Sequence, residues 1–403
     1  MSQKVFIIGA KRSPIGSFLG SMKDLHPVDL GTQVLKSLLN ETKIPKEKVD
    51  EVIIGNVLSA GLGQGIARQI AIKSGIPVEV PAYSVNMICG SGMKSVINAF
   101  VSISSGFADL IVAGGVESMS QAPYLIPSKS RDGFKMSDFT VVDHMIQDGL
   151  TDAFEKTHMG ITAENIATKH AIPRLDQETF SLQSQEKAIH AVDAGTFDQE
   201  IVPIEIKTRK ETLIFARDEF PNRFTSLDKM AKLRPAFKPD GSVTAATSSG
   251  INDGASFIIL ASESFVKEHH CPVLAEIIGI GQAGVEPSVM GLGPVPAIRK
   301  ALKFANKTLD QMDVIELNEA FAAQSLGVVK ELIEEHHLNR DAFLAKTNVN
   351  GGAIALGHPI GASGNRIIVT LIHEMIRHQK NTGLASLCIG GGMGTAVILK
   401  LNQ

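Results

Sequence analysis

The sequence contains little cysteine, no excess of basic residues and no long apolar run. These absences argue against a secreted, a nucleic-acid-binding and a membrane protein, respectively. Only three cysteines, Cys89, Cys271 and Cys388, occur among 403 residues. They are too few for the disulfide framework of a secreted protein, so a reducing compartment is expected. The net charge of −3 gives no basic excess for binding nucleic acid. No apolar run reaches the roughly 18 residues that span a bilayer, so no membrane segment is expected.

Targeting signals are also missing from the printed sequence. Residues 5–8 already have the apolar character of a strand, and neither a signal peptide nor an Arg-rich transit peptide precedes them. The last residues do not match a peroxisomal Ser-Lys-Leu signal. Together with the low cysteine content, this favours a cytoplasmic protein.

What the sequence does contain is an α/β pattern. Short apolar runs at residues 5–8, 52–54, 109–113 and 256–260 are typical of strands buried on both faces. Residues 28–39 place apolar side chains at helical spacing, and a second long helical pattern covers residues 174–190. We therefore predict an α/β fold with a mostly parallel sheet, and a chain of this length is expected to hold two or three domains.

The order of the segments indicates an internal repeat. Residues 50–54, a glycine-rich turn at 89–92 that opens a helix, and residues 109–115 follow one another in the first part of the chain. The same order recurs at residues 313–316, 350–364 and 385–392, after a polar, proline-containing interruption. The predicted units are an N-terminal half at 1–118 and 248–272, an inserted loop domain at 119–247 and a C-terminal half at 273–403. The crevice between the related halves should hold the site.

Cys89 stands where a strand-like run gives way to a helix. Residues 85–92 read Val-Asn-Met-Ile-Cys-Gly-Ser-Gly, and apolar residues recur at helical spacing from Met93 onward. At a helix N-terminus, free N–H groups and the helix dipole favour a thiolate. Cys89 is therefore a candidate nucleophile, although a buried structural cysteine is compatible with the same stretch.

Two further chemically capable residues lie in glycine-rich stretches, His358 within residues 357–364 and Cys388 ahead of glycines 390–392. A Cys–His pair is suited to acyl transfer through a thioester. A second cysteine could remove a proton from carbon, which points to forming or cleaving a carbon–carbon bond. The spacings of a zinc site are absent, so no metal is expected. Asn318, after another strand-like run, could hold a water or stabilise an oxyanion.

Four motifs carry a resemblance to a known family. They are Asn-Met-Ile-Cys-Gly-Ser-Gly at 86–92, Asn-Glu-Ala-Phe-Ala at 318–322, Gly-His-Pro-Ile-Gly-Ala-Ser-Gly at 357–364 and Cys-Ile-Gly-Gly-Gly-Met-Gly at 388–394. With these motifs in this order, the sequence resembles the thiolases, in particular their short-chain biosynthetic branch. The resemblance extends from Lys4 to the last predicted strand. It implies the thiolase fold, with two related mixed α/β halves and an inserted loop domain, and a homotetramer.

The resemblance also implies roles for the site residues. Cys89 would accept an acetyl group from acetyl-CoA with help from His358, and Cys388 would deprotonate a second acetyl-CoA to give acetoacetyl-CoA and CoA. The reverse reaction is thiolysis. His358 and a water on Asn318 would stabilise the enolate, while the N–H groups of Cys89 and Gly390 would hold the acyl carbonyl. Coenzyme A is then substrate and product, with no separate cofactor. The residues implied to contact it are Leu150, His158, Met159, Arg223, Phe237, Ala245, Ser249, Met290 and Phe321.

Alternatives within this family and outside it stay open. A degradative 3-ketoacyl-CoA thiolase would act on longer chains, but the bulky Met290 and residues 158–160 favour a short acyl group. A binding homologue without catalysis would carry degenerate motifs, and the four motifs are intact. Ketoacyl synthases pair their cysteine with different partners. If Cys89 and Cys388 share one cleft, oxidation could join them in an inactivating disulfide.

Overall fold

The apolar runs form the strands of one mixed sheet. The computed structural model describes residues 3–136 and 138–401, and within them the sheet has the order β12-β13-β14-β11-β1-β10-β5-β3-β4, with β2 paired to β10. The bounds are β1 (Val5–Arg12), β2 (Gly16–Ser17), β3 (Glu51–Gly55), β4 (Ala82–Val85), β5 (Leu110–Ser118), β10 (Asn252–Ser262), β11 (Ala275–Gly284), β12 (Val314–Leu317), β13 (Thr382–Ile389) and β14 (Met393–Leu401).

The prediction of a mostly parallel sheet is wrong. β3 runs parallel to β4 and β5, and β12 runs parallel to β13. In contrast, β1 pairs antiparallel with both β10 and β11, and β14 is antiparallel to β11 and β13. Apolar runs show that strands are buried on both faces but not which way they run. At β14 the direction follows from a three-residue turn, residues 390–392, where Gly391 and Gly392 have positive φ angles.

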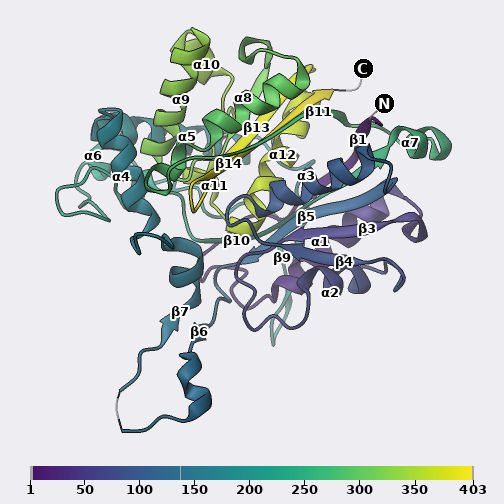
Figure 1. Ribbon diagram of the computed structural model, residues 1–403, viewed down its shortest axis with the longest axis horizontal. Helices are drawn as coiled ribbons and strands as arrows, with labels where there is room; N and C mark the ends of the chain where they lie inside the picture. The colour runs from purple at the N-terminus through teal and green to yellow at the C-terminus, as the bar shows by residue number, and fades with distance from the viewer. Residues whose placement is uncertain (1–2, 137, 402–403) are drawn as a thin grey trace.

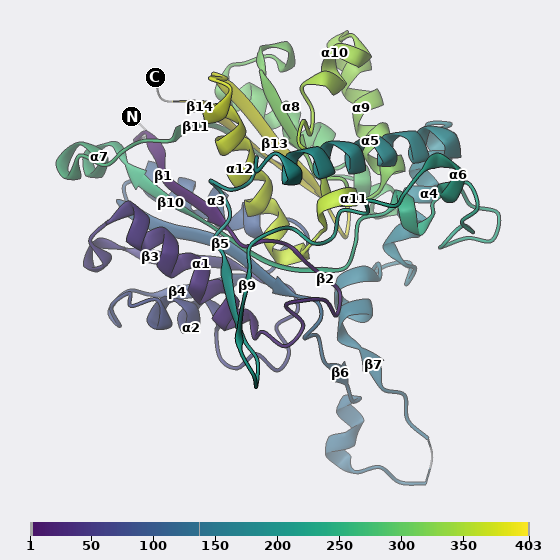
Figure 2. The ribbon, with the colours of Figure 1, turned by 180° about the vertical axis from the view of Figure 1, so that it is seen from behind.

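Helices cover both faces of each half of the sheet, which gives five layers (Figures 1 and 2). Helices α1 (Pro27–Thr42) and α2 (Ile66–Lys73) cover the outer face of the N-terminal half, and α8 (Pro294–Ala305) and α9 (Ala322–His336) cover that of the C-terminal half. Between the halves lie α3 (Ser91–Ser104) and α12 (Ile360–Arg377), in an apolar core shared with strands of both halves. The predicted pair of related halves is confirmed.

The two central helices approach closely because glycines line their contact. A Cβ atom on Gly92 of α3 would lie 2.8 Å from the backbone nitrogen of Asn365, and a Cβ on Gly364 of α12 would lie 2.6 Å from that of Met93. Neither position has room for a side chain. The beginnings of α3 and α12 therefore meet, and they carry the turns that contain Cys89 and His358.

Residues 119–247 form loops and helices around this core. An arm with strands β6 (Tyr124–Leu125) and β7 (Val142–Asp143) projects from the body in Figures 1 and 2. It is followed by a π-helical turn η3 (Met145–Leu150), helices α4 (Met159–Lys169) and α5 (Arg174–Asp193), the hairpin β8 (Ile204–Lys207) and β9 (Thr212–Phe215), and the short α6 (Leu227–Met230). Short helices α7 (Glu263–His269), α10 (Arg340–Ala345) and α11 (Ala353–Leu356) lie in the rest of the chain. Within the described residues, no helix has the length and apolar character needed to cross a membrane.

Candidate active site

Cys89 sits in a sharp turn between β4 and α3. The residue before it, Ile88, has a φ of 46°, which is unusual for a β-branched side chain and marks a strained backbone. Ser91 secures the turn, since its hydroxyl donates to the Ile88 carbonyl at 2.7 Å and accepts from the Met87 N–H at 2.8 Å. Because α3 begins at Ser91, the sequence prediction of a cysteine just before a helix is confirmed.

The pKa of the Cys89 thiol is raised, so the thiol is protonated near neutral pH. The residue is only partly accessible, and loss of hydration raises the pKa of its thiol to about 11. The backbone N–H groups of Gly390 and of Cys89 itself donate to the sulfur and oppose this rise without cancelling it. The expectation from the helix N-terminus is thus outweighed by burial, and deprotonation of Cys89 calls for a nearby base.

Cys388 reaches the same place from the C-terminal half. It is the penultimate residue of β13 and is fully buried. The β13–β14 turn packs on the Cys89 turn, because a Cβ on Gly90 would lie 2.3 Å from the Ile389 Cδ1 and one on Gly390 would lie 3.4 Å from the Ile88 Cγ2. Burial raises the pKa of the Cys388 thiol, and a negative charge on Cys89 would raise it further.

His358 lies just before α12 and is held at both its backbone and its ring. The Oδ1 atom of Asn252 accepts the His358 backbone N–H at 2.9 Å, and the ring Nδ1 lies 2.6 Å from the Ser363 hydroxyl. That hydroxyl donates to the Pro359 carbonyl at 3.0 Å, so we assign the ring contact as Nδ1–H donating to Ser363. The lone pair then resides on Nε2, which is buried and has no hydrogen-bond partner within the described residues.

The imidazole of His358 is neutral over the physiological range. Burial lowers its pKa to about 4, and the positive charge of Arg366 contributes to the shift. A neutral imidazole with a free Nε2 is a base that is ready to accept a proton. The start of α12, which follows His358, packs against the start of α3, which follows Cys89, so His358 is the candidate base for that thiol.

Asn318 has a buried polar side chain close to the end of a strand. It follows β12, is almost fully buried, and its backbone N–H donates to the Ser386 carbonyl at 3.0 Å. Neither its Oδ1 nor its Nδ2 has a partner among residues 3–136 and 138–401. Buried polar groups rarely go unpaired, so the side chain is suited to a water or a substrate oxygen.

Most residues implied to contact CoA gather next to these groups. The rings of His158 and Phe237 stack with centroids 4.7 Å apart, and Phe237 meets Phe321 edge-on at 5.9 Å. Met159, Met290 and Phe321 share an apolar cluster with Cys388, and Leu150 packs against the cluster that Cys89 adjoins. The backbone N–H of Ser249 donates to the Ala320 carbonyl at 2.9 Å, which ties its segment to the motif of Asn318.

Two of the implied CoA contacts, Arg223 and Ala245, are exposed. The Arg223 guanidinium forms an exposed ion pair with Asp193, at 2.6 and 2.8 Å. Ala245 begins a short 3-10 turn, η4 (Ala245–Thr247), and is exposed. Neither residue shares an apolar cluster with Cys89 or Cys388, so their role in CoA binding stays a prediction.

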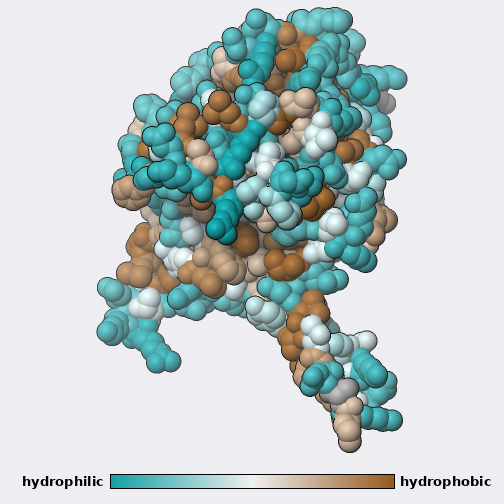
Figure 3. Space-filling model, turned by 90° about the vertical axis from the view of Figure 1, so that its left-hand side faces the viewer, coloured by the Kyte–Doolittle hydropathy of each residue, from teal (hydrophilic) through white to brown (hydrophobic). Residues whose placement is uncertain are grey.

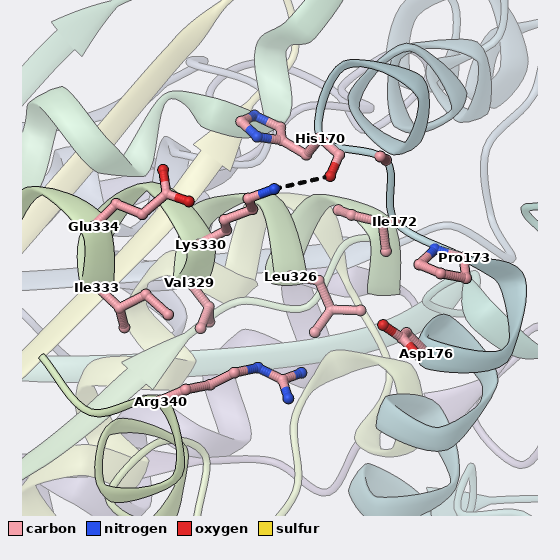
Figure 4. Close-up of a pocket in the computed structure, with 11 residues that line it drawn as sticks. His170, Ile172, Pro173, Asp176, Leu326, Val329, Lys330, Ile333, Glu334 and Arg340 are labelled. Atoms are coloured by element: carbon pink, nitrogen blue, oxygen red, sulfur yellow. Dashed lines mark hydrogen bonds between the residues drawn. The ribbon is translucent and has the colours of Figure 1, made fainter.

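A cavity of about 280 Å³ opens beside the catalytic turns. Ile88, Met159, Gly390 and Gly391 line one part of it, and residues between 147 and 156 line the rest. Another pocket, of about 310 Å³, lies between the start of α5, α9 and Arg340. Figure 4 shows Lys330 there, donating to the His170 carbonyl at 3.1 Å. None of the candidate catalytic residues lines that second pocket.

Sequence reasoning missed three residues that hold the site. Ser363 and Asn252 fix His358, and Glu117 accepts N–H groups from both halves of the molecule. Ser363 falls inside a recognised motif, and Glu117 is an acidic residue near the end of an otherwise apolar strand. Asn252 gave no comparable signal. The described residues contain no group of three or more His, Cys, Asp or Glu able to hold a metal ion.

The Cys89 turn contacts the β13–β14 turn that follows Cys388, and the start of α12 after His358 contacts the start of α3. This arrangement is that of a thiolase, and comparison with known proteins agrees. Residues 5–264 match the thiolase N-terminal domain and residues 271–401 match the thiolase C-terminal domain. The chain belongs to the thiolase family.

Particular relatives are similar over their whole length. An acetyl-CoA acetyltransferase of Pseudomonas aeruginosa is 52% identical over 398 residues, covering 98% of this chain and 99% of the relative. The solved structure of the acetyl-CoA acetyltransferase from Syntrophomonas wolfei matches with a TM-score of 0.96 at 41% identity, with each chain covered completely. Human mitochondrial 3-ketoacyl-CoA thiolase in complex with CoA matches with a TM-score of 0.93 at 44% identity, covering 100% of this chain and 98% of the other.

Proposed function

We propose that this protein is an acetyl-CoA acetyltransferase, which condenses two molecules of acetyl-CoA into acetoacetyl-CoA and CoA and catalyses the reverse thiolysis. The observation that carries the proposal is the contact between the Cys89 and Cys388 turns, with a neutral His358 brought in by the close packing of α3 and α12. Coenzyme A is substrate and product in this reaction, and no further cofactor takes part.

The first step transfers an acetyl group to Cys89. His358 Nε2 accepts the proton of the Cys89 thiol as the sulfur attacks the acetyl carbonyl. The N–H groups of Cys89 and Gly390, which already donate to the sulfur, are placed to hold the oxyanion. The carbon–sulfur bond to CoA breaks, and the CoA thiolate takes the proton of Cys388.

The second step forms the carbon–carbon bond. The Cys388 thiolate removes a proton from the methyl group of a second acetyl-CoA. The enolate oxygen is stabilised by protonated His358 and by a water on the unpartnered Asn318 side chain. The enolate carbon attacks the acetyl group, Cys89 leaves as a thiolate, and His358 returns its proton, so that every group regains its starting state.

The second candidate is a 3-ketoacyl-CoA thiolase that acts on longer acyl chains. It is favoured by the 44% identity to the human mitochondrial enzyme, which exceeds the 41% identity to the Syntrophomonas wolfei structure. Met290 argues for the short-chain activity, because it is buried in the apolar cluster that contains Cys388 and fills space beside the reacting thiols.

The experiment that separates the candidates compares thiolysis of acetoacetyl-CoA with thiolysis of 3-ketooctanoyl-CoA. We expect a higher kcat/KM with acetoacetyl-CoA, and a relative gain on the longer substrate in Met290→Ala. Equal or faster turnover of 3-ketooctanoyl-CoA by the unmodified protein would favour the second candidate.

We also propose a cytoplasmic homotetramer. The arm, described at residues 120–136 and 138–144, carries exposed apolar side chains on a slender projection, which is visible at the lower right of Figure 3. They include Tyr124, Ile126, Phe134, Met136, Phe139 and Val141. Such a concentration is typical of an interface. Sedimentation should give four chains, and Tyr124→Ser with Ile126→Ser should give smaller assemblies. The cytoplasmic location is supported by the three free cysteines, and the proposed reaction requires that the Cys89 thiol stays reduced.

A further inference from the structure

Glu117 is a fully buried carboxylate that uses both of its oxygens. Its Oε1 accepts the side-chain N–H of Asn56 at 3.0 Å and the backbone N–H of Leu58 at 3.1 Å. Its Oε2 accepts the backbone N–H of Val57 at 3.0 Å and that of Gly361 at 2.9 Å. A carboxylate can accept about four hydrogen bonds, so Glu117 is saturated by donors from two segments far apart in the sequence.

One of those donors lies in the first turn of α12. The N-cap residue of this helix, Pro359, makes no side-chain capping bond, so the free N–H groups of the first turn need acceptors from elsewhere. Glu117 caps Gly361 from β5, in the other half of the molecule, and its negative charge suits the helix N-terminus. A Cβ on Gly361 would lie 2.5 Å from the Glu117 Oε2, so the contact depends on a glycine there.

The other donors lie beneath the Cys89 turn. Val57 and Leu58 belong to the apolar cluster against which Ile88 and Cys89 pack. Gly361 is only three residues after His358. The Glu117 carboxylate therefore joins the segment that supports the nucleophile to the helix that carries the base.

We propose that Glu117 is a positioning residue that holds His358 against Cys89 by clamping the first turn of α12 to residues 56–58. This inference rests on the proposed roles of Cys89 and His358. Glu117 touches no reacting atom in this scheme. Its charge also bears on Cys89, whose thiol pKa it raises.

The principal test is Glu117→Gln. Glutamine has nearly the same shape as glutamate, but its NH₂ group would face N–H donors. The hydrogen bonds accepted by at least one of the two Glu117 oxygens are therefore lost. Burial, with a contribution from Asp253, raises the pKa of Glu117 to about 7, so assays at pH 8.5 compare an ionised carboxylate with a neutral amide. We expect kcat for thiolysis to fall between about 10- and 100-fold, as small misplacement of catalytic groups does. KM should change less than about threefold, because none of the residues implied to contact CoA hydrogen-bonds to Glu117.

A second readout does not depend on turnover. The rate of Cys89 alkylation by iodoacetamide, followed against pH, should show its midpoint at lower pH in Glu117→Gln, because a neighbouring negative charge is gone. Asp313→Asn is the control. That carboxylate is exposed, but it also accepts backbone N–H groups, from Asn381 and Thr382 at 3.0 and 2.9 Å. It immediately precedes β12, whereas Asn318 follows the other end of that strand. It should leave both kcat and the alkylation midpoint unchanged.

Gly361→Ala breaks the same contact from the other side and keeps the proposal testable if Glu117→Gln fails to fold. Its effect on kcat should be smaller in the Glu117→Gln background than alone, because both changes remove one interaction. Full kcat with an unmoved alkylation midpoint in Glu117→Gln, or independent effects of the two changes, would overturn the proposal. Activity retained in His358→Ala would instead refute the proposed function, which separates the two failures.

Discussion

The Nδ1 atom of His358 lies 2.6 Å from the hydroxyl of Ser363, and that hydroxyl donates to the Pro359 carbonyl. This pair fixes which ring nitrogen carries the proton. It turns a buried histidine into a base whose lone pair is available at Nε2, which faces no other partner among the described residues. The chemistry proposed for Cys89 depends on that tautomer.

Ser363→Ala should therefore impair catalysis more than binding. Without the hydroxyl, Nδ1–H loses its acceptor and the ring can adopt the other tautomer. We therefore expect kcat to fall by about 100-fold, the lower end of what a general base contributes. KM for acetoacetyl-CoA should change little. Ser181→Ala is the control, since Ser181 is also buried and donates to the carbonyl four residues earlier, at 2.8 Å, but in α5. Equal losses in both variants would contradict the tautomer role.

The low pKa of His358 predicts a dependence of stability on pH. In the unfolded chain the imidazole titrates near 6.5, and in the folded protein burial lowers its pKa to about 4. The unfolded state therefore binds more protons as pH falls from 6.5 towards 4. Across that window the folded state should lose about 3 kcal/mol through this group alone. Denaturant titrations should show a steeper loss in the unmodified protein than in His358→Asn; parallel curves would mean that His358 is not buried in the neutral form.

Asn318 and Asn348 offer a contrast between two buried asparagines. Within the described part of the chain, the Asn318 side chain has no hydrogen-bond partner. Asn348 accepts from the Leu317 N–H at 2.8 Å and donates to the Leu317 carbonyl and to Glu319. Asn318→Ala should reduce kcat by about 100-fold through loss of the oxyanion water while leaving the protein no less stable. Asn348→Ala should lower the free energy of unfolding by about 2 kcal/mol or more. A marked destabilisation in Asn318→Ala would show that its side chain has a structural partner.

The contact between the central helices predicts sensitivity to a single methyl group. Gly92→Ala would place a Cβ 2.8 Å from the backbone nitrogen of Asn365, and backbone cannot move aside cheaply. Stability should fall by about 1 to 3 kcal/mol, and kcat should fall with it because Cys89 and His358 separate. Gly284→Ala is the control, as its nearest neighbour would be the Gly392 carbonyl at 3.6 Å. Thermal denaturation and thiolysis assays measure both effects, and an unchanged Gly92→Ala would contradict the packing.

The candidate catalytic residues could be proposed from sequence because they lie in local motifs. Cys89, His358, Cys388 and Asn318 each follow or precede a glycine-rich turn or a strand end, and the repeat of such segments indicated two related halves. The supporting residues could not be predicted in the same way. Glu117 and Gly361 are 244 residues apart, and no local pattern reports a contact of that span. Strand direction was misjudged at β1 for a related reason, since its neighbours β10 and β11 come from far along the chain.

The pKa of Cys89 differs from the expectation for another reason. The position before a helix suggested a stabilised thiolate, and the hydrogen bonds from the N–H groups of Gly390 and Cys89 act in that direction. Burial has the larger effect and reverses the shift. Sequence shows the dipole of a local helix but not the desolvation caused by a distant turn.

The most direct test of the two-cysteine mechanism is to look for the acetyl group itself. Cys388→Ala is incubated with acetyl-CoA, quenched in acid and mapped by peptide mass spectrometry, with Cys89→Ala treated in parallel. We expect one acetyl group on Cys89 in the Cys388→Ala protein, no acetoacetyl-CoA formed, and no acetylation of the Cys89→Ala protein. Acetylation at another residue, or condensation that persists without Cys388, would contradict the proposed division of labour.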